Sequence, residues 1–227
     1  MKVLIIIPAY NEEENIEKVV ENLKLNYKMF DYIVVNDGSK DRTAEICKDR
    51  GYNLIDLPIN LGLAAAFQTG VKYAYRHHYD CAIQFDADGQ HRAEYIEKLV
   101  AKIEEGYDIA IGSRFVEKKK EKSLRMIGSR VISGVIKITT GFRLNDPTSG
   151  MRMLNQRMIK EFALNLNYGP EPDTISYLYK KGCKITEVQV EMDERTAGES
   201  YLNLKRSIIY MMRMTMSILF VQSFRKK

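Results

Sequence analysis

The chain has 227 residues, of which 45% are hydrophobic and 29% are charged, and its net charge is +5. This composition is ordinary for a globular protein and excludes collagen-like, low-complexity and disulfide-scaffold proteins. The three cysteines are far apart and form no disulfide framework or zinc-binding pattern, so we expect a reducing compartment such as the cytoplasm. No secretory leader is recognisable ahead of Pro8, and no nucleic-acid-binding motif is present.

Apolar strands and amphipathic helices alternate through most of the chain. Strands are predicted at residues 2–7, 32–35, 53–56, 81–85, 108–112 and 184–190, and residues 146–152 are predicted to form a turn entering another strand. Helices are predicted after Asn11, which we expect to cap the first one, from about residue 41, and over residues 63–75, 93–104, 124–139 and 171–181. This alternation predicts an α/β fold with a mostly parallel central sheet flanked by helices. No G-x-G-x-x-G motif follows the first strand, which argues against a dinucleotide-binding enzyme.

The C-terminal segment, residues 202–224, has helical periodicity and is rich in apolar residues. Arg206, Tyr210, Arg213 and Ser217 fall along one narrow stripe of this helix. Its uninterrupted apolar stretches are shorter than the about 20 residues of a bilayer span, so we expect an amphipathic helix lying on a membrane surface. Packing on the domain or on a second subunit, as in a homodimer, is the alternative. We therefore divide the chain into a domain of residues 1–200 and a basic amphipathic tail helix of residues 201–227.

Basic residues without neighbouring acids mark two segments of the chain. No acid occurs between Lys122 and Asp146, and none follows Glu199. Basic, apolar segments of this kind adhere to anionic membrane surfaces or to phosphates. A solvated basic face is the alternative interpretation.

Two carboxylates, Asp86 and Asp88, follow the apolar strand of residues 81–85. Ligands of open α/β sheets bind at the carboxyl ends of the strands. Mg²⁺ is often held there by one or two carboxylates together with substrate phosphates. The sequence thus predicts a metal–diphosphate site, and an ordinary Asp-Gly turn is the alternative.

Five motifs in order resemble those of family 2 glycosyltransferases with the GT-A nucleotide-diphospho-sugar transferase fold. They are PAYNE at 8–12, VNDGS at 35–39, NLG at 60–62, DADGQ at 86–90 and GSR at 112–114. The turn at 146–152 and the later R-x-x-G-x-S at 195–200 resemble the branch that contains dolichol- and polyprenyl-phosphate sugar synthases.

The resemblance implies a role for each matching residue. The nucleotide-sugar pocket would be formed by Pro8, Ala9, Tyr10, Glu12, Asp37, Asn60, Asp86, Ala87, Asp88 and Arg114. Asp37 would accept a hydrogen bond from the base, and Asp86, Asp88 and Gln90 would hold Mg²⁺ or Mn²⁺. Arg114 and Arg195 would bind phosphate oxygens during catalysis, and the acceptor would meet Asp146, Ser149, Arg195 and Ser200.

The acceptor decides whether the predicted inverting transfer needs a general base. A hydroxyl acceptor needs one, and Asp173 is the first candidate and Glu171 the second. A phosphate acceptor is already an anion and needs none. The favoured function is transfer of a hexose from a nucleotide-diphosphate sugar, UDP favoured, to a polyprenyl phosphate at the cytoplasmic membrane face. Transfer to a sugar hydroxyl of a lipid-linked polysaccharide or glycolipid, and a non-catalytic nucleotide-sugar-binding scaffold, are the alternatives.

Overall fold

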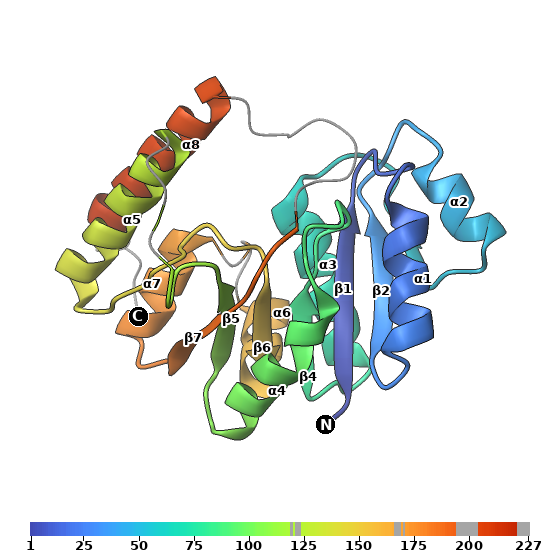
Figure 1. Ribbon diagram of the computed structural model, residues 1–227, viewed down its shortest axis with the longest axis horizontal. Helices are drawn as coiled ribbons and strands as arrows, with labels where there is room; N and C mark the ends of the chain where they lie inside the picture. The colour runs from blue at the N-terminus through green and yellow to red at the C-terminus, as the bar shows by residue number, and fades with distance from the viewer. Residues whose placement is uncertain (119, 121–123, 166–168, 170, 194–203, 222–227) are drawn as a thin grey trace.

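A seven-stranded sheet forms the centre of the protein (Figure 1). The structure, a computed structural model, describes residues 1–118, 120, 124–165, 169, 171–193 and 204–221. The strands are β1 (Val3–Ala9), β2 (Asp31–Asn36), β3 (Leu54–Asp56), β4 (Cys81–Gln84), β5 (Ile109–Ser113), β6 (Arg152–Asn155) and β7 (Ile185–Gln189), in the order β3-β2-β1-β4-β6-β5-β7. All neighbouring strands are parallel except β6, which runs antiparallel to β4 and β5 between them. The predicted mostly parallel sheet is confirmed.

Helices cover both faces of this sheet. They are α1 (Ile16–Asn26), α2 (Thr43–Asp49), α3 (Leu63–Arg76), α4 (Ile96–Glu104) after the 3₁₀ turn Ala93–Tyr95, α5 (Leu124–Thr140), α6 (Gln156–Leu164), α7 (Pro172–Lys180) and α8 (Leu204–Met216), which continues into the π-helical turn Ser217–Val221. Helices α3, α5, α6, α7 and α8 bury apolar residues on one face, and α1, α2 and α4 do so on the other. Every residue of β1 is buried because Leu4 and Ile6 point to the first layer and Val3, Ile5 and Ile7 to the second.

Two local features differ from the sequence predictions. Helix α1 begins at Ile16 with Asn15 at its N-cap position, so the prediction that Asn11 caps it was wrong. Asn11 instead has a φ of 55°, and its Oδ1 accepts a hydrogen bond from Lys40 N. Helix α6 was not predicted at all. It starts where the Asn155 side chain accepts a hydrogen bond from Met158 N, which is the usual capping arrangement.

The C-terminal helix α8 packs beside α5 and also contacts α7 (Figure 1). Met214 and Ile218 are buried in the core of the domain. Tyr210 and Ser217, two members of the predicted polar stripe, point inward and bind acids of the segment that starts α7. The opposite side of the helix is exposed and apolar, and consists of Ile208, Ile209, Met212, Met216, Leu219 and Phe220. Among the described residues, no helix combines the length and hydropathy of a bilayer-crossing segment.

Candidate active site

The parallel strands β1, β2 and β4 end at one edge of the sheet, and the antiparallel strand β6 begins there. This arrangement brings the residues after β1, β2 and β4 together with Arg152, the first residue of β6. Asp37 N donates a hydrogen bond to Ala9 O across 2.8 Å, which ties the ends of β1 and β2 together. The predicted site residues from three separate motifs therefore meet at this edge.

The loops after β1 and β2 are joined by hydrogen bonds between backbone amides and side chains. Asn11 N donates to Ser39 Oγ across 2.9 Å, and Glu12 N donates to Thr43 Oγ1 across 2.8 Å. Pro8 and Ala9 are buried within β1, whereas the side chains of Tyr10 and Glu12 are partly exposed beside them. Of the predicted pocket residues on this loop, Tyr10 and Glu12 thus offer accessible side chains.

Asp37 is 3% exposed and uses both carboxylate oxygens to hold the loop that precedes α3. Leu61 N donates to its Oδ1 and Gly62 N to its Oδ2, each across 2.8 Å. Gly38 makes this approach possible, because a Cβ there would lie 2.5 Å from the backbone carbon of Ile59. Asp37 therefore fixes the loop that carries Asn60. The expected hydrogen bond from a nucleobase to Asp37 stays a prediction. It would use lone pairs of the carboxylate oxygens that the two backbone amides leave unoccupied.

The loop after β4 holds the two candidate metal ligands in different environments. Gln84 Nε2 donates to Asp86 Oδ1 across 3.0 Å, and the backbone of Asp86 donates to His91 Nδ1 across 2.9 Å. His91 is buried, and because its Nδ1 accepts this bond, its proton resides on Nε2, which lies 3.6 Å from Asp86 Oδ2. Asp88, whose Oδ1 accepts a hydrogen bond from Gln90 N across 3.1 Å, is partly exposed. His91, which holds Asp86 in place, was missed by the sequence analysis.

A close backbone contact fixes the position of Asp86. Gly150, in the turn that leads into β6, has so little free space that a Cβ there would lie 2.5 Å from Asp86 Oδ2. The small residue of the T-S-G segment thus leaves room for the carboxylate. Ala87, the next predicted pocket residue, is 3% exposed.

The donor set at this loop fits a hard divalent cation that completes its coordination with substrate oxygens. Among the residues that the structure describes, no group of three or more His, Cys, Asp or Glu side chains converges as a complete metal cage. This loop supplies two carboxylates, and proteins commonly bind Mg²⁺ with one or two carboxylates together with substrate phosphates. Gln90, the third predicted ligand, directs its Nε2 toward Asp193 O at 3.5 Å.

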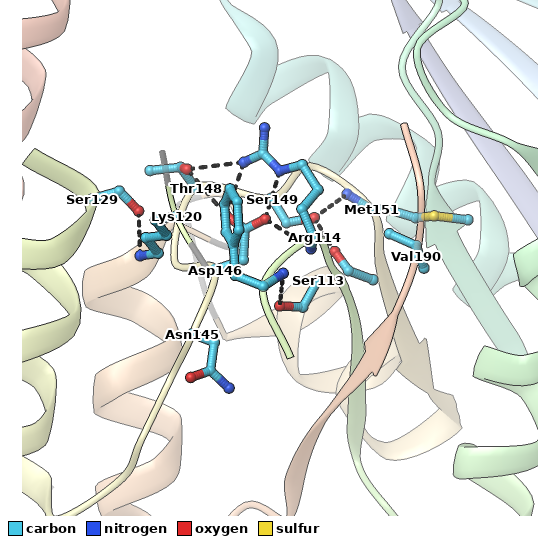
Figure 2. Close-up of polar contacts among 12 residues, drawn as sticks. Ser113, Arg114, Lys120, Ser129, Asn145, Asp146, Thr148, Ser149, Met151 and Val190 are labelled. Atoms are coloured by element: carbon cyan, nitrogen blue, oxygen red, sulfur yellow. Dashed lines mark hydrogen bonds and ion pairs between the residues drawn. The ribbon is translucent and has the colours of Figure 1, made fainter. Parts of the chain in front are cut away.

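Arg114, which is partly exposed, and Asp146, which is buried, form an ion pair beside this edge (Figure 2). Arg114 Nε donates to Asp146 Oδ2 across 2.7 Å and its Nη2 donates to Oδ1 across 2.9 Å. Burial raises the pKa of Asp146, but the hydrogen bonds and charge of Arg114 outweigh it, and the pKa lies below its ordinary value. Ser149 is also buried and donates to Gly112 O across 2.5 Å. Asp146 and Ser149 hold the turn at 146–150, and their contact with an acceptor stays a prediction.

The two candidate general bases lie near the start of α7 and are both engaged by the C-terminal helix. Asp173 is 7% exposed, and its Oδ1 accepts from Thr174 N across 2.8 Å while its Oδ2 accepts from Ser217 Oγ across 2.6 Å. The carboxylate of Glu171 accepts a hydrogen bond from the hydroxyl of Tyr210. Neither acid presents a carboxylate with both oxygens open to solvent.

A buried cation, Arg152, lies between these acids and the metal-site loop. It is 4% exposed, and its Nη2 donates to Pro147 O across 2.7 Å. Burial lowers the pKa of Arg152, and the charges of Glu171 and Asp86 act against that effect. The sequence analysis did not predict that Arg152 is buried near these acids, because it treated Arg152 only as the last residue of a turn. Arg195 and Ser200, predicted to bind the acceptor and phosphate, lie outside the described residues.

The chain is similar to known proteins in sequence and in fold. Residues 4–163 match the family model of Glycosyl transferase family 2. The undecaprenyl-phosphate mannosyltransferase of Micrococcus luteus is 30% identical over 216 residues, which are 89% of this chain and 88% of that protein. The UDP-N-acetylglucosamine–dolichyl-phosphate N-acetylglucosaminyltransferase of Methanococcus voltae is 33% identical over 179 residues, which are 70% of this chain and 71% of that protein.

A solved structure has the same fold. The crystal structure of glucosyl-3-phosphoglycerate synthase from Mycobacterium tuberculosis in complex with Mn²⁺, UDP-glucose and phosphoglyceric acid matches with a TM-score of 0.73 and 15% identity. The match covers 100% of this chain and 81% of that chain, and it confirms the predicted GT-A fold. The family match, the two relatives and the shared fold lead to one conclusion: the chain belongs to glycosyl transferase family 2 and is a glycosyltransferase.

Proposed function

We propose that the chain transfers a hexose from a nucleotide-diphosphate sugar, with UDP favoured, to a polyprenyl phosphate, with Mg²⁺ or Mn²⁺ as cofactor. The names of the two relatives above include undecaprenyl phosphate and dolichyl phosphate as acceptors, and UDP belongs to one of those names. These names support the acceptor class and the choice of nucleotide.

The engagement of Asp173 and Glu171 by α8 carries the choice between a phosphate and a hydroxyl acceptor. A hydroxyl acceptor needs a carboxylate that is free to take its proton. Asp173 already accepts hydrogen bonds at both oxygens, and Glu171 accepts one from Tyr210. A phosphate acceptor needs no such base, so the arrangement favours it.

In the proposed reaction, an oxygen of the acceptor phosphate forms the new bond to the anomeric carbon. The bond between that carbon and the β-phosphate oxygen of the donor breaks, and the nucleoside diphosphate leaves with the electron pair. Displacement from the opposite side inverts the configuration at the anomeric carbon. No proton has to be removed from the acceptor for this step.

The residues at the sheet edge divide the remaining work. Asp86 and Asp88 would hold the metal, which when bound neutralises charge on the leaving diphosphate. His91, Gln84 and the close contact with Gly150 orient Asp86. Tyr10 and Glu12 would contact the nucleotide with their accessible side chains. They lie near Asp37, whose carboxylate accepts two hydrogen bonds from the loop before α3.

Attachment to the cytoplasmic face of a membrane is part of the proposal. The acceptor is a lipid, so the enzyme must reach the bilayer surface. The exposed apolar side of α8 offers residues that insert at such a surface, including Met212 at 64% and Phe220 at 55% exposure. A second copy of the chain covering this side is the alternative.

A transfer assay tests the proposed reaction. Purified protein is incubated with Mg²⁺ or Mn²⁺, a panel of UDP-, GDP- and dTDP-sugars, and polyprenyl phosphate, and sugar is measured in the organic phase. We expect a metal-dependent lipid product that is lost when EDTA is added. Donor hydrolysis without lipid product would move the acceptor to a hydroxyl. Binding of nucleotide sugar without turnover on any acceptor would favour the scaffold alternative.

A further inference from the structure

Arg152, the first residue of β6, carries a positive charge in the interior of the protein. It is 4% exposed, its Nη2 donates to Pro147 O across 2.7 Å, and its Nε has no hydrogen-bond partner among the residues that the structure describes. Within the same residues, Arg152 forms no ion pair. Burying a charge without an ion pair costs folding free energy, which an apolar side chain of similar volume would avoid. Stability therefore does not explain why an arginine occupies this position.

Strand pairing places Arg152 next to the loop that carries the candidate metal ligands. Arg152 lies opposite Gln84 of β4 and Ile111 of β5. Residues directly opposite one another in neighbouring antiparallel strands point to the same face of the sheet. Gln84 Nε2 in turn donates to Asp86 Oδ1 across 3.0 Å. Arg152 is thus a neighbour of the side chain that orients Asp86.

The turn at 146–150 connects Arg152 to Asp86 by a second route. Arg152 holds this turn through its hydrogen bond to Pro147 O. Gly150, at the end of the turn, lies so close to Asp86 that a Cβ there would be 2.5 Å from Oδ2. A shift of the turn would therefore change the space that the carboxylate occupies. The two oxygens of Asp86 thus face Gln84 and Gly150, and Arg152 adjoins both.

Arg152 also interacts with three acids at a distance. Burial lowers the pKa of Arg152, and the charges of Glu171, Asp146 and Asp86 oppose that effect. These acids accept hydrogen bonds from other side chains, which are Tyr210, Arg114 and Gln84 respectively. The guanidinium therefore stabilises the acids through its charge, while its hydrogen bond to Pro147 O fixes where that charge lies.

We infer that Arg152 is a positioning residue for the candidate metal ligand Asp86. Its charge and its hydrogen bond to Pro147 O keep the turn and the carboxylate in the arrangement that receives a divalent cation. Side chains that orient metal ligands typically account for about 10–100-fold in metal affinity. The inference rests on the metal-binding role of Asp86 and Asp88 in the proposed function, but it does not depend on the identity of the acceptor.

Mn²⁺ binding to the full chain, measured by electron paramagnetic resonance without nucleotide, tests the inference. Removing a nearby positive charge would by itself favour binding of a cation, so a pure charge effect and a positioning effect predict opposite results. We expect Arg152→Met to bind Mn²⁺ at least about tenfold more weakly than wild type. Arg152→Lys keeps the charge and a donor, and we expect it to stay within about threefold. Unchanged or tighter binding by Arg152→Met, or an equal loss in Arg152→Lys, overturns the inference.

Arg157→Met is the matched control for the loss of an arginine. Arg157 Nε donates to Asp108 Oδ1 across 3.0 Å, and Asp108 precedes β5 at the end of the sheet opposite the candidate site. We expect this variant to melt at a lower temperature and to bind Mn²⁺ within about twofold of wild type. A loss of Mn²⁺ affinity equal to that of Arg152→Met would indicate general loosening and overturn the inference. If circular dichroism shows that Arg152→Met does not fold, Arg152→Gln replaces it with the same expectation.

The same measurement with UDP present distinguishes positioning from direct contact with a phosphate. We expect the loss in Arg152→Met both with and without UDP. A loss that appears only with UDP would mean that Arg152 binds phosphate oxygens, and it would overturn the positioning role. Absence of Mn²⁺ binding by wild type under both conditions would contradict the proposed metal cofactor and the inference together. The expected binding pattern without lipid product in the transfer assay would leave the inference standing and contradict the proposed function.

Discussion

Ser217, in the turn that continues α8, donates a hydrogen bond from its Oγ to Oδ2 of Asp173 across 2.6 Å. The bond joins two residues 44 positions apart, and it places the last described turn of the chain on the acid that sequence analysis nominates as a general base. An acid that is held in this way supports the structure near the site. A base must instead exchange its proton with the acceptor.

Asp173→Asn tests this distinction. We expect kcat/KM for transfer to polyprenyl phosphate to stay within about threefold of wild type, because a phosphate acceptor needs no general base. Loss of a true general base would cost about 10²–10⁴-fold. Ser217→Ala is the matched variant that removes one hydrogen bond to the carboxylate and keeps the acid, and we expect it to be equally active. A loss above about 100-fold in Asp173→Asn, with Ser217→Ala unaffected, would show that Asp173 is the base.

Asp88→Asn removes the partly exposed carboxylate of the candidate metal pair. Because a bound divalent metal supplies several kcal/mol of charge stabilisation, we expect transfer to fall by at least about 100-fold. The metal-dependent affinity for UDP, measured by calorimetry, should fall with it. Asp49→Asn, at an exposed position of α2, serves as the control and should behave as wild type. Substantial transfer by Asp88→Asn in the presence of metal would contradict the assignment.

Gly150→Ala should separate activity from stability. The new Cβ would lie 2.5 Å from Asp86 Oδ2, the end of a side chain that can rotate away. We expect the fold to persist and transfer to fall about tenfold or more, because the carboxylate loses its position. Gly134→Ala in α5, where a Cβ meets nothing within 4 Å, is the control and should leave transfer unchanged. Thermal melting and kcat/KM of both variants check this expectation.

The ion pair between partly exposed Arg114 and buried Asp146 predicts a pH dependence of stability. The pKa of Asp146 is lower in the folded protein, so its contribution is fully present above the unfolded value of about 3.9 and is lost as the pH falls through the lower folded value. We expect Asp146→Asn to lower the free energy of unfolding at pH 7 by about 3 kcal/mol. Urea unfolding should show this difference shrinking between pH 5 and pH 3. A difference that stays constant over this range would mean that Arg114 does not lower the pKa of Asp146.

The sequence predicted the elements that depend on local pattern. The unbroken apolar run of β1 and the alternation of strands and helices anticipated the parallel sheet, because such runs are buried on both faces. The insertion of β6 between β4 and β5 carried no comparable signal, since strand pairing depends on contacts far apart in the chain. Arg152 owes its place beside Asp86 and Glu171 to that insertion, so its role was not predictable.

The C-terminal helix shows the same limit more sharply. Its periodicity predicted a polar stripe, but the direction in which the stripe faces depends on partners elsewhere in the chain. Tyr210 and Ser217 point inward because their hydroxyl groups donate hydrogen bonds to Glu171 and Asp173 at the start of α7. The helix thus directs two polar side chains as well as Met214 and Ile218 toward the domain and leaves an apolar side exposed, which departs from the usual arrangement of an amphipathic helix.

The strand order also sets the sequence in which the protein can be completed during synthesis. Strands β1 to β4 and their helices are all made before residue 105, but β4 then forms an open edge, because its next neighbour β6 starts only at Arg152. This edge, Cys81–Gln84, is fully buried in the finished protein and apolar at three of its four positions. A ribosome that pauses between β4 and β6 would leave this strand edge unpaired, and an unpaired apolar edge is a template for aggregation.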